Sequence, residues 1–321
     1  MKSYIYFFLF VFLGACTQDK VSYEENIIVK SGNVYYNLQS LESSFKVMFL
    51  SDTHFTVEDS LGYEYYDYSK RMGGFAVEPE NYGISNGREN ALLVSLEKAK
   101  KDSVDLVILG GDIINFPSVA SVDSVQDIME QSGLKWEYIS GNHDWHYEGE
   151  PGIANEQRAR WINSNLNPLY QGQNPFFRSV ILHGINFVLI DNSTNEIMEE
   201  QLAFLKGEIK KGLPIILSVH VPIYFPGQNI DYSCGNPNWN EEHDIYYKIE
   251  RREPWPANGH TKVTYEFCDI VTSEPLIIGI FAGHTHEVAV DYYNDKIQYV
   301  SGANYAGSDV MIHFNKINSR K

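Results

Sequence analysis

The chain has 321 residues, enough for one large domain or two domains of average size. Hydrophobic residues make up 43% of it and aromatic residues 14%, so a sizeable core can form. The formal net charge is -17, whereas proteins that bind the phosphate backbone of nucleic acid usually carry a basic face. We therefore expect no nucleic-acid partner. A small phosphorylated ligand stays compatible with this charge, because bound divalent metal ions would reverse its sign locally.

The N-terminus, MKSYIYFFLFVFLGAC, has the build of a secretory signal. Its apolar run from Tyr4 to Leu13 is too short to span a bilayer and is followed by small residues. Leu13-Gly14-Ala15-Cys16 resembles the lipobox of bacterial lipoproteins. The resemblance implies a signal peptide over residues 1–15 and a lipid on Cys16. It also implies a membrane-anchored location in the bacterial cell envelope, on the periplasmic side or the outer surface. An ordinary cleaved signal or a short N-terminal anchor is the alternative.

The first strand-length apolar run, Phe45 to Leu50, ends at Ser51-Asp52-Thr53-His54. A long segment rich in Tyr, Gly and acidic residues follows, over about 55–88. A segment of this length inside a domain is usually functional or flexible, so we expect it to lie beside a site. A surface insertion without a role is the alternative. Apolar residues then recur at helical spacing from Asn90 to Lys101.

Two further strands each end in a polar tip. Val104 to Leu109 leads to Gly110-Gly111-Asp112, and Trp136 to Ile139 leads to Gly141-Asn142-His143-Asp144. Between them, Val119 to Gly133 has the apolar spacing of a helix. Ligand sites of open α/β sheets lie at the carboxyl ends of the strands. The pattern therefore predicts an α/β fold with a site at this edge.

The next elements repeat this arrangement. Gln157 to Asn163 has helical character, and Phe176 to Leu182 and Ile185 to Ile190 are predicted to form antiparallel strands around a His183-Gly184 turn. A predicted helix over Glu196 to Lys211 precedes a buried strand, Pro214 to Val219, which ends in His220-Val221-Pro222.

The regular pattern is lost over about 223–262, a segment that we expect to wall the pocket and to select the substrate. Four more strands are then predicted, over Val263–Cys268, Ile277–Phe281, Ile297–Val300 and Val310–Phe314. The second of these ends at Gly283-His284-Thr285-His286. Cys234 and Cys268 could pair in an envelope compartment or stay unpaired, because spacing does not decide connectivity.

The polar tips share one property, which is that each follows an apolar strand. They are Asp52, His54, Asp112, Asn142, His143, Asp144, His220, His284 and His286. Carboxylate, imidazole and amide groups without thiolate suit Mn, Fe or Zn. The set is too large for one small ion and suits two ions that share Asp112. Two such ions, about 3.5–4 Å apart, would stabilise an in-line displacement at a phosphoester.

In chain order, these motifs resemble the signature of the calcineurin-like metallophosphoesterase superfamily. The matching blocks are Asp52-x-His54, Gly111-Asp112, Gly141-Asn142-His143-Asp144, His220 and Gly283-His284-x-His286. The resemblance implies a four-layer α/β sandwich of two mixed central β-sheets flanked by helices. We therefore expect a tether and lead-in over residues 16–44 and one phosphoesterase domain over 45–315, with the two irregular segments as insertions.

The resemblance also implies a role for each residue of the blocks. Asp52, His54 and His286 would hold the first metal, and Asn142, His220 and His284 the second. Asp112 would bridge the two together with a hydroxide. His143 would contact the phosphate and assist the leaving group, and Asp144 would orient the ring of His143.

The implied activity is dinuclear-metal-dependent hydrolysis of a small phosphoester, either a monoester or a diester. A non-catalytic envelope lipoprotein that uses the same fold as a metal-stabilised binding scaffold is the alternative, since fold does not guarantee activity. The sequence does not predict the oligomeric state. Candidate phosphate or substrate contacts are Arg71, Arg88, Arg251, Arg252, His146 and His260. For the arginines, ordinary surface charge is the alternative.

One position departs from the purple members of the superfamily, which carry a tyrosine three residues after the bridging aspartate. Asn115 occupies that position here. We therefore expect no tyrosinate charge-transfer band in the visible spectrum of the metal-loaded protein. A purple absorbance band would contradict this expectation.

Overall fold

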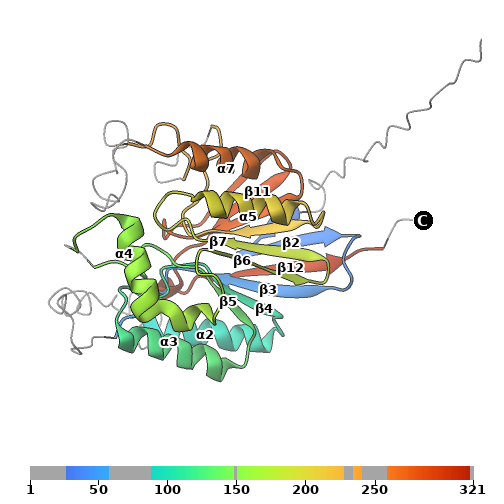
Figure 1. Ribbon diagram of the computed structural model, residues 1–321. Coiled ribbons are helices and arrows are strands. Elements are labelled where there is room, and N and C mark those ends of the chain that lie inside the picture. The colour runs from blue at the N-terminus through green and yellow to red at the C-terminus, as the bar shows by residue number, and fades with distance from the viewer. Residues whose placement is uncertain (1–26, 58–87, 148–149, 228–233, 241–258, 319–321) are drawn as a thin grey trace, which may run out of the picture.

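Two six-stranded sheets form the centre of the molecule, and helices cover their outer faces (Figure 1). The computed structural model describes residues 27–57, 88–147, 150–227, 234–240 and 259–318. Figure 1 shows helices α2 and α3 on one side of the sheets and α5 and α7 on the other. This arrangement confirms the predicted α/β sandwich. Within the described residues, no helix combines the length and apolar character needed to cross a membrane.

The first sheet has the strand order β1-β2-β12-β3-β4-β5. Its strands are β1 (Ile27–Lys30), β2 (Asn33–Leu38), β12 (Val310–Lys316), β3 (Phe45–Leu50), β4 (Leu106–Leu109) and β5 (Trp136–Tyr138). Strands β3, β4 and β5 run parallel, so their carboxyl ends meet at one edge. Helices α2 (Arg88–Lys101) and α3 (Val119–Ser132) pack their apolar residues against the outer face of these strands.

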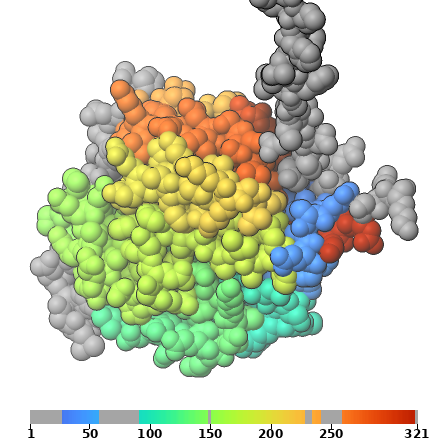
Figure 2. All heavy atoms as spheres, turned by 45° about the vertical axis from the view of Figure 1, so that its right-hand side comes forward, coloured from blue at the N-terminus to red at the C-terminus, as the bar shows by residue number. Residues whose placement is uncertain are grey.

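The second sheet has the strand order β10-β11-β9-β8-β7-β6. Its strands are β10 (Ala289–Tyr293), β11 (Lys296–Val300), β9 (Ile277–Ala282), β8 (Ile215–Ser218), β7 (Ile185–Ile190) and β6 (Phe177–Leu182). Strands β7, β8, β9 and β11 are parallel. Helices α5 (Glu199–Ile209) and α7 (Lys262–Ser273) lie side by side on its outer face (Figure 2).

Aromatic rings fill the space between the two sheets. The ring of Phe45 stacks on Phe314 with centroids 4.5 Å apart and meets Phe187 of the opposite sheet edge-on at 6.1 Å. Tyr36 of β2 also stacks on Phe314, and its buried side chain reaches Gly279 of β9 in the other sheet. The inner layer therefore depends on close contact between a ring of one sheet and the bare backbone of the other.

Gly279→Ala is expected to lower the free energy of unfolding by about 1–3 kcal/mol, the usual effect of overpacking a filled core. A Cβ atom at this position would lie 2.0 Å from the hydroxyl oxygen of Tyr36 and 3.2 Å from Cδ1 of Ile216. Gly207→Ala is the control, because a Cβ there meets nothing within 4 Å and the residue lies in α5. Chemical denaturation measures both. Equal midpoints for Gly279→Ala and the wild type would contradict the expectation.

Most of the predicted strands and helices are confirmed to within a few residues, but one is wrong. Residues predicted as a strand, Val263–Cys268, lie in helix α7. Its buried residues Thr264, Phe267, Cys268 and Val271 recur at helical spacing, and the side chain of Thr261 caps the helix by accepting from the N–H of Thr264. The β-branched and aromatic residues suggested a strand, but burial of one helical face and the cap decide the outcome.

Three strands are not predicted from the sequence. The β1–β2 hairpin joins the first sheet through β12, and β10 pairs with β11 at the edge of the second. β1 and β10 are short and partly exposed, so their apolar pattern is weak. β2 has six residues with buried Val34, Tyr36 and Leu38 in alternation, a strand pattern that the prediction missed. The helix predicted over Gln157 to Asn163 is present as α4 (Ala154–Trp161), which continues as a π-turn over Ile162–Leu166 and a 3₁₀ turn over Asn167–Tyr170.

Candidate metal centre

Loops from both sheets meet at the carboxyl ends of the parallel strands. Asp52 and His54 follow β3, Asp112 follows β4, Asn142 follows β5, His220 follows β8, and His284 and His286 follow β9. The first two loops are joined by backbone hydrogen bonds, from Asp52 N to Gly111 O at 2.9 Å and from His54 N to Asp112 O at 2.9 Å. In the second sheet, Gly283 N donates to His220 O at 3.0 Å. These backbone hydrogen bonds fix the positions of the loops that carry the predicted ligands.

Three overlapping groups of donor atoms occur in the part of the chain that the structure describes, and within each group the atoms lie within 4.8 Å of one another. The groups are Asp52, His54 and His286; His54, Asp112 and His143; and Asp112, His220 and His284. Asp112 and His54 each belong to two groups, so the clusters are continuous. All of these residues except His143 and His286 are buried.

The imidazole of His220 is held in the orientation of a ligand. Its Nδ1 lies 3.0 Å from the carbonyl oxygen of Gly110, which can only accept, so Nδ1 carries a proton. Its Nε2 then faces Oδ1 of Asn142 at 3.2 Å and Oδ2 of Asp112 at 3.3 Å. Burial opposes protonation, but the charge of Asp112 overrides it and raises the pKa of His220 to about 10. A cation among these three atoms would satisfy them in place of that proton.

The imidazoles of His54 and His286 face each other through their Nε2 atoms. Nε2 of His54 and Nε2 of His286 lie only 3.0 Å apart, and Oδ1 of Asp52 lies 3.5 Å from the latter. Both Nδ1 atoms face oxygen atoms, that of Asn115 at 3.2 Å and the hydroxyl of Tyr305 at 3.2 Å. When Nδ1 carries the proton, two nitrogen lone pairs point at each other. A shared cation removes that repulsion, so these residues fit a metal ion.

Backbone strain concentrates on the same residues. Five of the predicted ligands have positive φ angles: Asp52 (55°), His54 (47°), Asp112 (51°), His284 (74°) and His286 (62°). A non-glycine residue in this region costs on the order of 1 kcal/mol and persists only where the surrounding structure imposes it. The fold therefore holds these side chains in orientations that an unconstrained chain would avoid, as is common at functional sites.

Two glycines allow the loops to approach so closely. Gly111 has φ of 94°, and a Cβ there would lie 2.6 Å from Nδ1 of His220. A Cβ on Gly141 would lie 2.2 Å from Oδ1 of Asp112. Any larger residue at either position would displace a predicted ligand.

His143 and Asp144 lie at the edge of the cluster. The N–H of His143 donates to Oδ1 of Asp112 at 2.7 Å, and its ring stands edge-on to His54 with centroids 4.6 Å apart. The buried carboxylate of Asp144 accepts from the N–H of Ile114 at 2.8 Å and of Gly141 at 2.7 Å. These contacts fix the loop, and the role of Asp144 in orienting the ring of His143 stays a prediction.

Three aspartates, Asp52, Asp112 and Asp144, are buried at or beside the cluster. Burial, and then the charge of Asp112, raises the pKa of Asp144 to about 8. Burial likewise raises the pKa of Asp52. Burial would also raise the pKa of Asp112, but His220, His143 and His54 lower it well below its ordinary value. Buried carboxylates need a compensating cation, which protonated histidines or bound metal can supply.

The other candidate residues belong to none of the three donor groups or lie outside the described residues. Nδ1 of His260 donates to Oε1 of Glu196 at 3.1 Å, and its ring stacks on Trp239. Nδ1 of His146 lies 3.4 Å from Oε1 of Gln157. Cys234 and Cys268 are buried and free, with Sγ of Cys268 3.4 Å from the carbonyl oxygen of Cys234. Arg88 begins helix α2. The remaining candidates, Cys16, Arg71, Arg251 and Arg252, lie outside the described residues.

Two residues at the site, Tyr305 and Asn115, belong to none of the motifs. Tyr305 comes from a 3₁₀ turn (Asn304–Ala306) after β11, and its N–H donates to Asp52 O at 3.3 Å. The sequence draws attention to Asn115 only through its expected effect on the visible spectrum, yet its Oδ1 lies 3.2 Å from Nδ1 of His54. Metal-bound histidines usually have such a partner on the second nitrogen. The sequence offers no sign of this pairing, because it depends on contacts between distant segments.

Comparison with known proteins identifies the family. A family model described as calcineurin-like phosphoesterase matches residues 45–288. The chain belongs to this family. The resemblance inferred from the motifs is thereby confirmed, and so is membership in a class of metal-dependent hydrolases. No match was found among curated protein sequences.

A solved structure supports the fold of this phosphoesterase. A dimetal phosphatase from Danio rerio superposes with a TM-score of 0.54 at 12% sequence identity, over 85% of this chain and 93% of that chain. The protein TT1561 of Thermus thermophilus superposes with a TM-score of 0.42 at 12% identity, over 82% of this chain and 91% of that chain. At such identities the likeness shows the fold alone, so the chemistry of the phosphoesterase has to be argued from its own residues.

Proposed function

We propose that this phosphoesterase hydrolyses a small phosphorylated substrate at a pair of metal ions, Mn, Fe or Zn. Asp52, His54 and His286 hold the first ion, Asn142, His220 and His284 hold the second, and Asp112 belongs to both. The observation that carries the proposal is the direction of Asp112. Its Oδ2 lies 3.3 Å from Nε2 of His220 and 3.9 Å from Nε2 of His54, so one oxygen faces ligands of both groups.

Two such ions, when bound, neutralise the charge of a phosphoester and make water nucleophilic near neutral pH. The residues of the chain do the rest. Asp112 is held by the N–H of His143, which leaves its second oxygen for the centre of the cluster. The His143 ring stands edge-on to His54, and we propose that it contacts the phosphate and gives a proton to the leaving oxygen.

The exposure of the ligands supports one direction of entry for the substrate. The side chain of His286 is 38% exposed, whereas that of His220 is fully buried. Solvent and substrate therefore reach the cluster from the side of His286 and Tyr305. Access of this kind is needed at a catalytic metal site, which keeps a coordination position for water or substrate.

Elemental analysis and an activity screen test the proposal together. Protein loaded with Mn, Fe or Zn is expected to contain two ions per chain and to hydrolyse p-nitrophenyl phosphate, bis(p-nitrophenyl) phosphate or both. The ratio of the two rates separates a monoesterase from a diesterase. A protein that binds two ions but hydrolyses nothing across a broad phosphoester panel would instead be a metal-stabilised binding scaffold.

We also propose that the phosphoesterase is anchored to a bacterial envelope membrane through a lipid on Cys16, on the strength of the Leu13-Gly14-Ala15-Cys16 sequence. Mass spectrometry of the chain expressed in a bacterium is expected to show an acylated N-terminal cysteine. Cys16→Ser is expected to release the protein from the membrane fraction. Wild-type protein without acyl mass would contradict this.

A further inference from the structure

The loop after β7 is polar and buried, although no predicted metal ligand lies in it. The exposed surface is zero or nearly so for Asp191, Asn192, Ser193, Thr194 and Asn195. Burying so many polar groups is costly unless each is used. The loop occupies the same edge of the sheet as the ligand loops after β8 and β9, the next strands of the sheet. Its contacts show what it does there.

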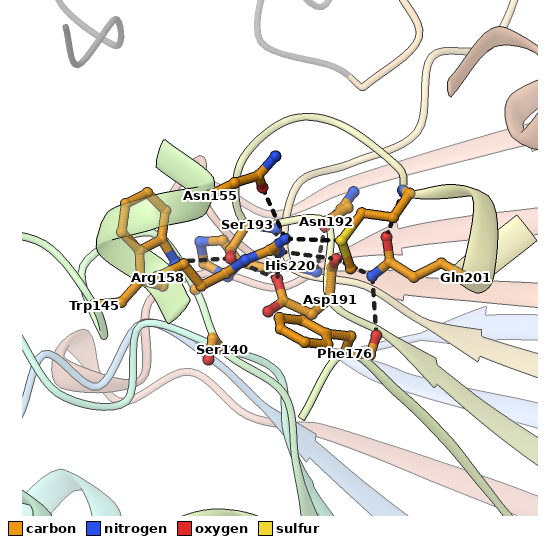
Figure 3. Close-up of polar contacts among 12 residues, drawn as sticks. Ser140, Trp145, Asn155, Arg158, Phe176, Asp191, Asn192, Ser193, Gln201 and His220 are labelled. Atoms are coloured by element: carbon orange, nitrogen blue, oxygen red, sulfur yellow. Dashed lines mark hydrogen bonds and ion pairs between the residues drawn. The ribbon is translucent and has the colours of Figure 1, made fainter. Parts of the chain in front are cut away.

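The side chain of Asn192 holds the backbone that carries His220. Its Oδ1 accepts from the N–H of His220 at 3.0 Å and from the N–H of Val221 at 2.9 Å. Its Nδ2 donates to the carbonyl oxygen of Val221 at 2.7 Å. One amide therefore binds three backbone groups of two consecutive residues, as Figure 3 shows for the contact with His220.

Contacts with neighbouring segments fix the loop that carries Asn192. Oδ1 of Asp191 lies 3.1 Å from Nη1 of the buried Arg158 and accepts from the N–H of Ser193 at 2.8 Å. Gln201 donates to the carbonyl oxygen of Asp191 at 2.6 Å. Figure 3 shows these contacts gathered around Asp191.

The same loop reaches the other ligand-bearing segment. Nε1 of Trp145 donates to Oγ of Ser193 at 2.8 Å, and Trp145 directly follows His143 and Asp144 (Figure 3). Through Asn192 and Ser193, the loop after β7 therefore contacts both the loop that carries His220 in the second sheet and the loop that carries Asn142 in the first. These are the loops whose side chains, His220 and Asn142, meet at 3.2 Å.

We infer that Asn192 is a positioning residue for the second metal ion. By fixing the peptide groups of His220 and Val221, it delivers the imidazole to the gap between Asp112 and Asn142. The inference rests on the metal site of the proposed function, and it concerns the affinity of that site for an ion rather than the reaction. Outer contacts of this kind typically change metal affinity by about 10- to 100-fold.

Asn192→Leu tests the inference, because leucine has the same branched shape and number of side-chain heavy atoms but no hydrogen-bonding group. Isothermal titration with Mn²⁺ or Zn²⁺ is expected to show the first ion bound as in the wild type and the second bound about 10- to 100-fold more weakly. Hydrolysis of an aryl phosphoester is expected to fall at limiting metal and to recover at excess metal. A variant that merely loosened the fold would not be rescued in this way.

Asn186→Leu is the matched control. Asn186 is also a buried asparagine, in β7 itself, and its Nδ2 donates to Oε2 of Glu208 at 2.8 Å, away from the predicted ligands. We expect Asn186→Leu to lose thermal stability but to bind both ions as the wild type does. Asn192→Ser, which is smaller and leaves room for water, replaces Asn192→Leu if the latter does not fold, and the same weakening of the second ion is expected.

The outcomes separate this inference from the proposed function. If Asn192→Leu or Asn192→Ser binds both ions with wild-type affinity, the positioning role is overturned even where the wild type hydrolyses phosphoesters. If the wild type binds two ions but is inactive, the proposed function fails, and a selective loss of the second ion in the Asn192 variants still supports the positioning role.

Discussion

Asp112→Asn is expected to lower the turnover of an aryl phosphoester at least about a thousandfold, more than the loss of a single stabilising hydrogen bond usually costs. The substitution preserves shape and removes one negative charge. Oδ2 of Asp112 faces both His54 and His220, so its charge serves both groups of ligands. A neutral amide cannot offset two cations that lie close together. Elemental analysis is therefore expected to find fewer than two ions in the variant, and steady-state kinetics measures the loss.

Asp105→Asn is the control for this prediction. Asp105 precedes the same strand, β4, at the end opposite to Asp112, and its Oδ2 accepts from the N–H of Lys46 at 3.0 Å. Its substitution removes the same charge from the surface and is expected to leave turnover and metal content unchanged. Full activity of Asp112→Asn with two ions bound would remove the basis of the two-metal proposal.

His143→Gln is expected to reduce kcat by about 100- to 10,000-fold, the usual contribution of a general acid. Glutamine retains the backbone N–H that donates to Asp112, so the metal ligands keep their arrangement. Two ions per chain should therefore remain bound. The combination of intact metal content and low kcat distinguishes a residue that handles the leaving group from one that holds an ion.

The control here is His313→Gln, since His313 lies on β12 and stacks on Tyr35 with ring centroids 4.4 Å apart. It is expected to keep kcat. The prediction for His143 also extends to substrates with different leaving groups. Because a good leaving group needs little protonation, the loss should be smaller for p-nitrophenol than for an alkyl alcohol. An equal loss for both would argue against proton donation by His143.

The sequence predicted which polar side chains gather in the cluster because each of them follows a recognisable strand. Apolar runs such as Phe45–Leu50 and Ile277–Phe281 are long enough to identify locally, and the motifs come directly after them. The carboxyl ends of parallel strands share one edge of a sheet, so residues that directly follow different strands of that sheet are expected to be neighbours. This places Asp52 and Asp112, which follow neighbouring parallel strands of one sheet, together from the sequence alone. His220 follows a strand of the other sheet, so this rule does not by itself join it to the same site.

Helix α7 shows where local patterns fail. Val263, Thr264, Tyr265 and Phe267 favour a strand by intrinsic propensity, yet they lie in a helix. The burial of Phe267, Cys268 and Val271 against the second sheet selects the helical period. Propensity is a weak guide when tertiary packing can bury one face of either structure.

The sequence by itself determined the chemical identity of the site: which carboxylates, imidazoles and amide are available, and the strand each one follows. Only the tertiary structure decided how these groups are aimed. Three features depend on segments far apart in the chain. They are the left-handed backbone at Asp52, His54 and Asp112, the hydrogen bond from the N–H of His220 to Asn192, and the contacts of Asn115 and Tyr305 with the Nδ1 atoms of His54 and His286. Orientation arises from packing and hydrogen bonds between such segments, and these leave no periodic trace in the order of the amino acids.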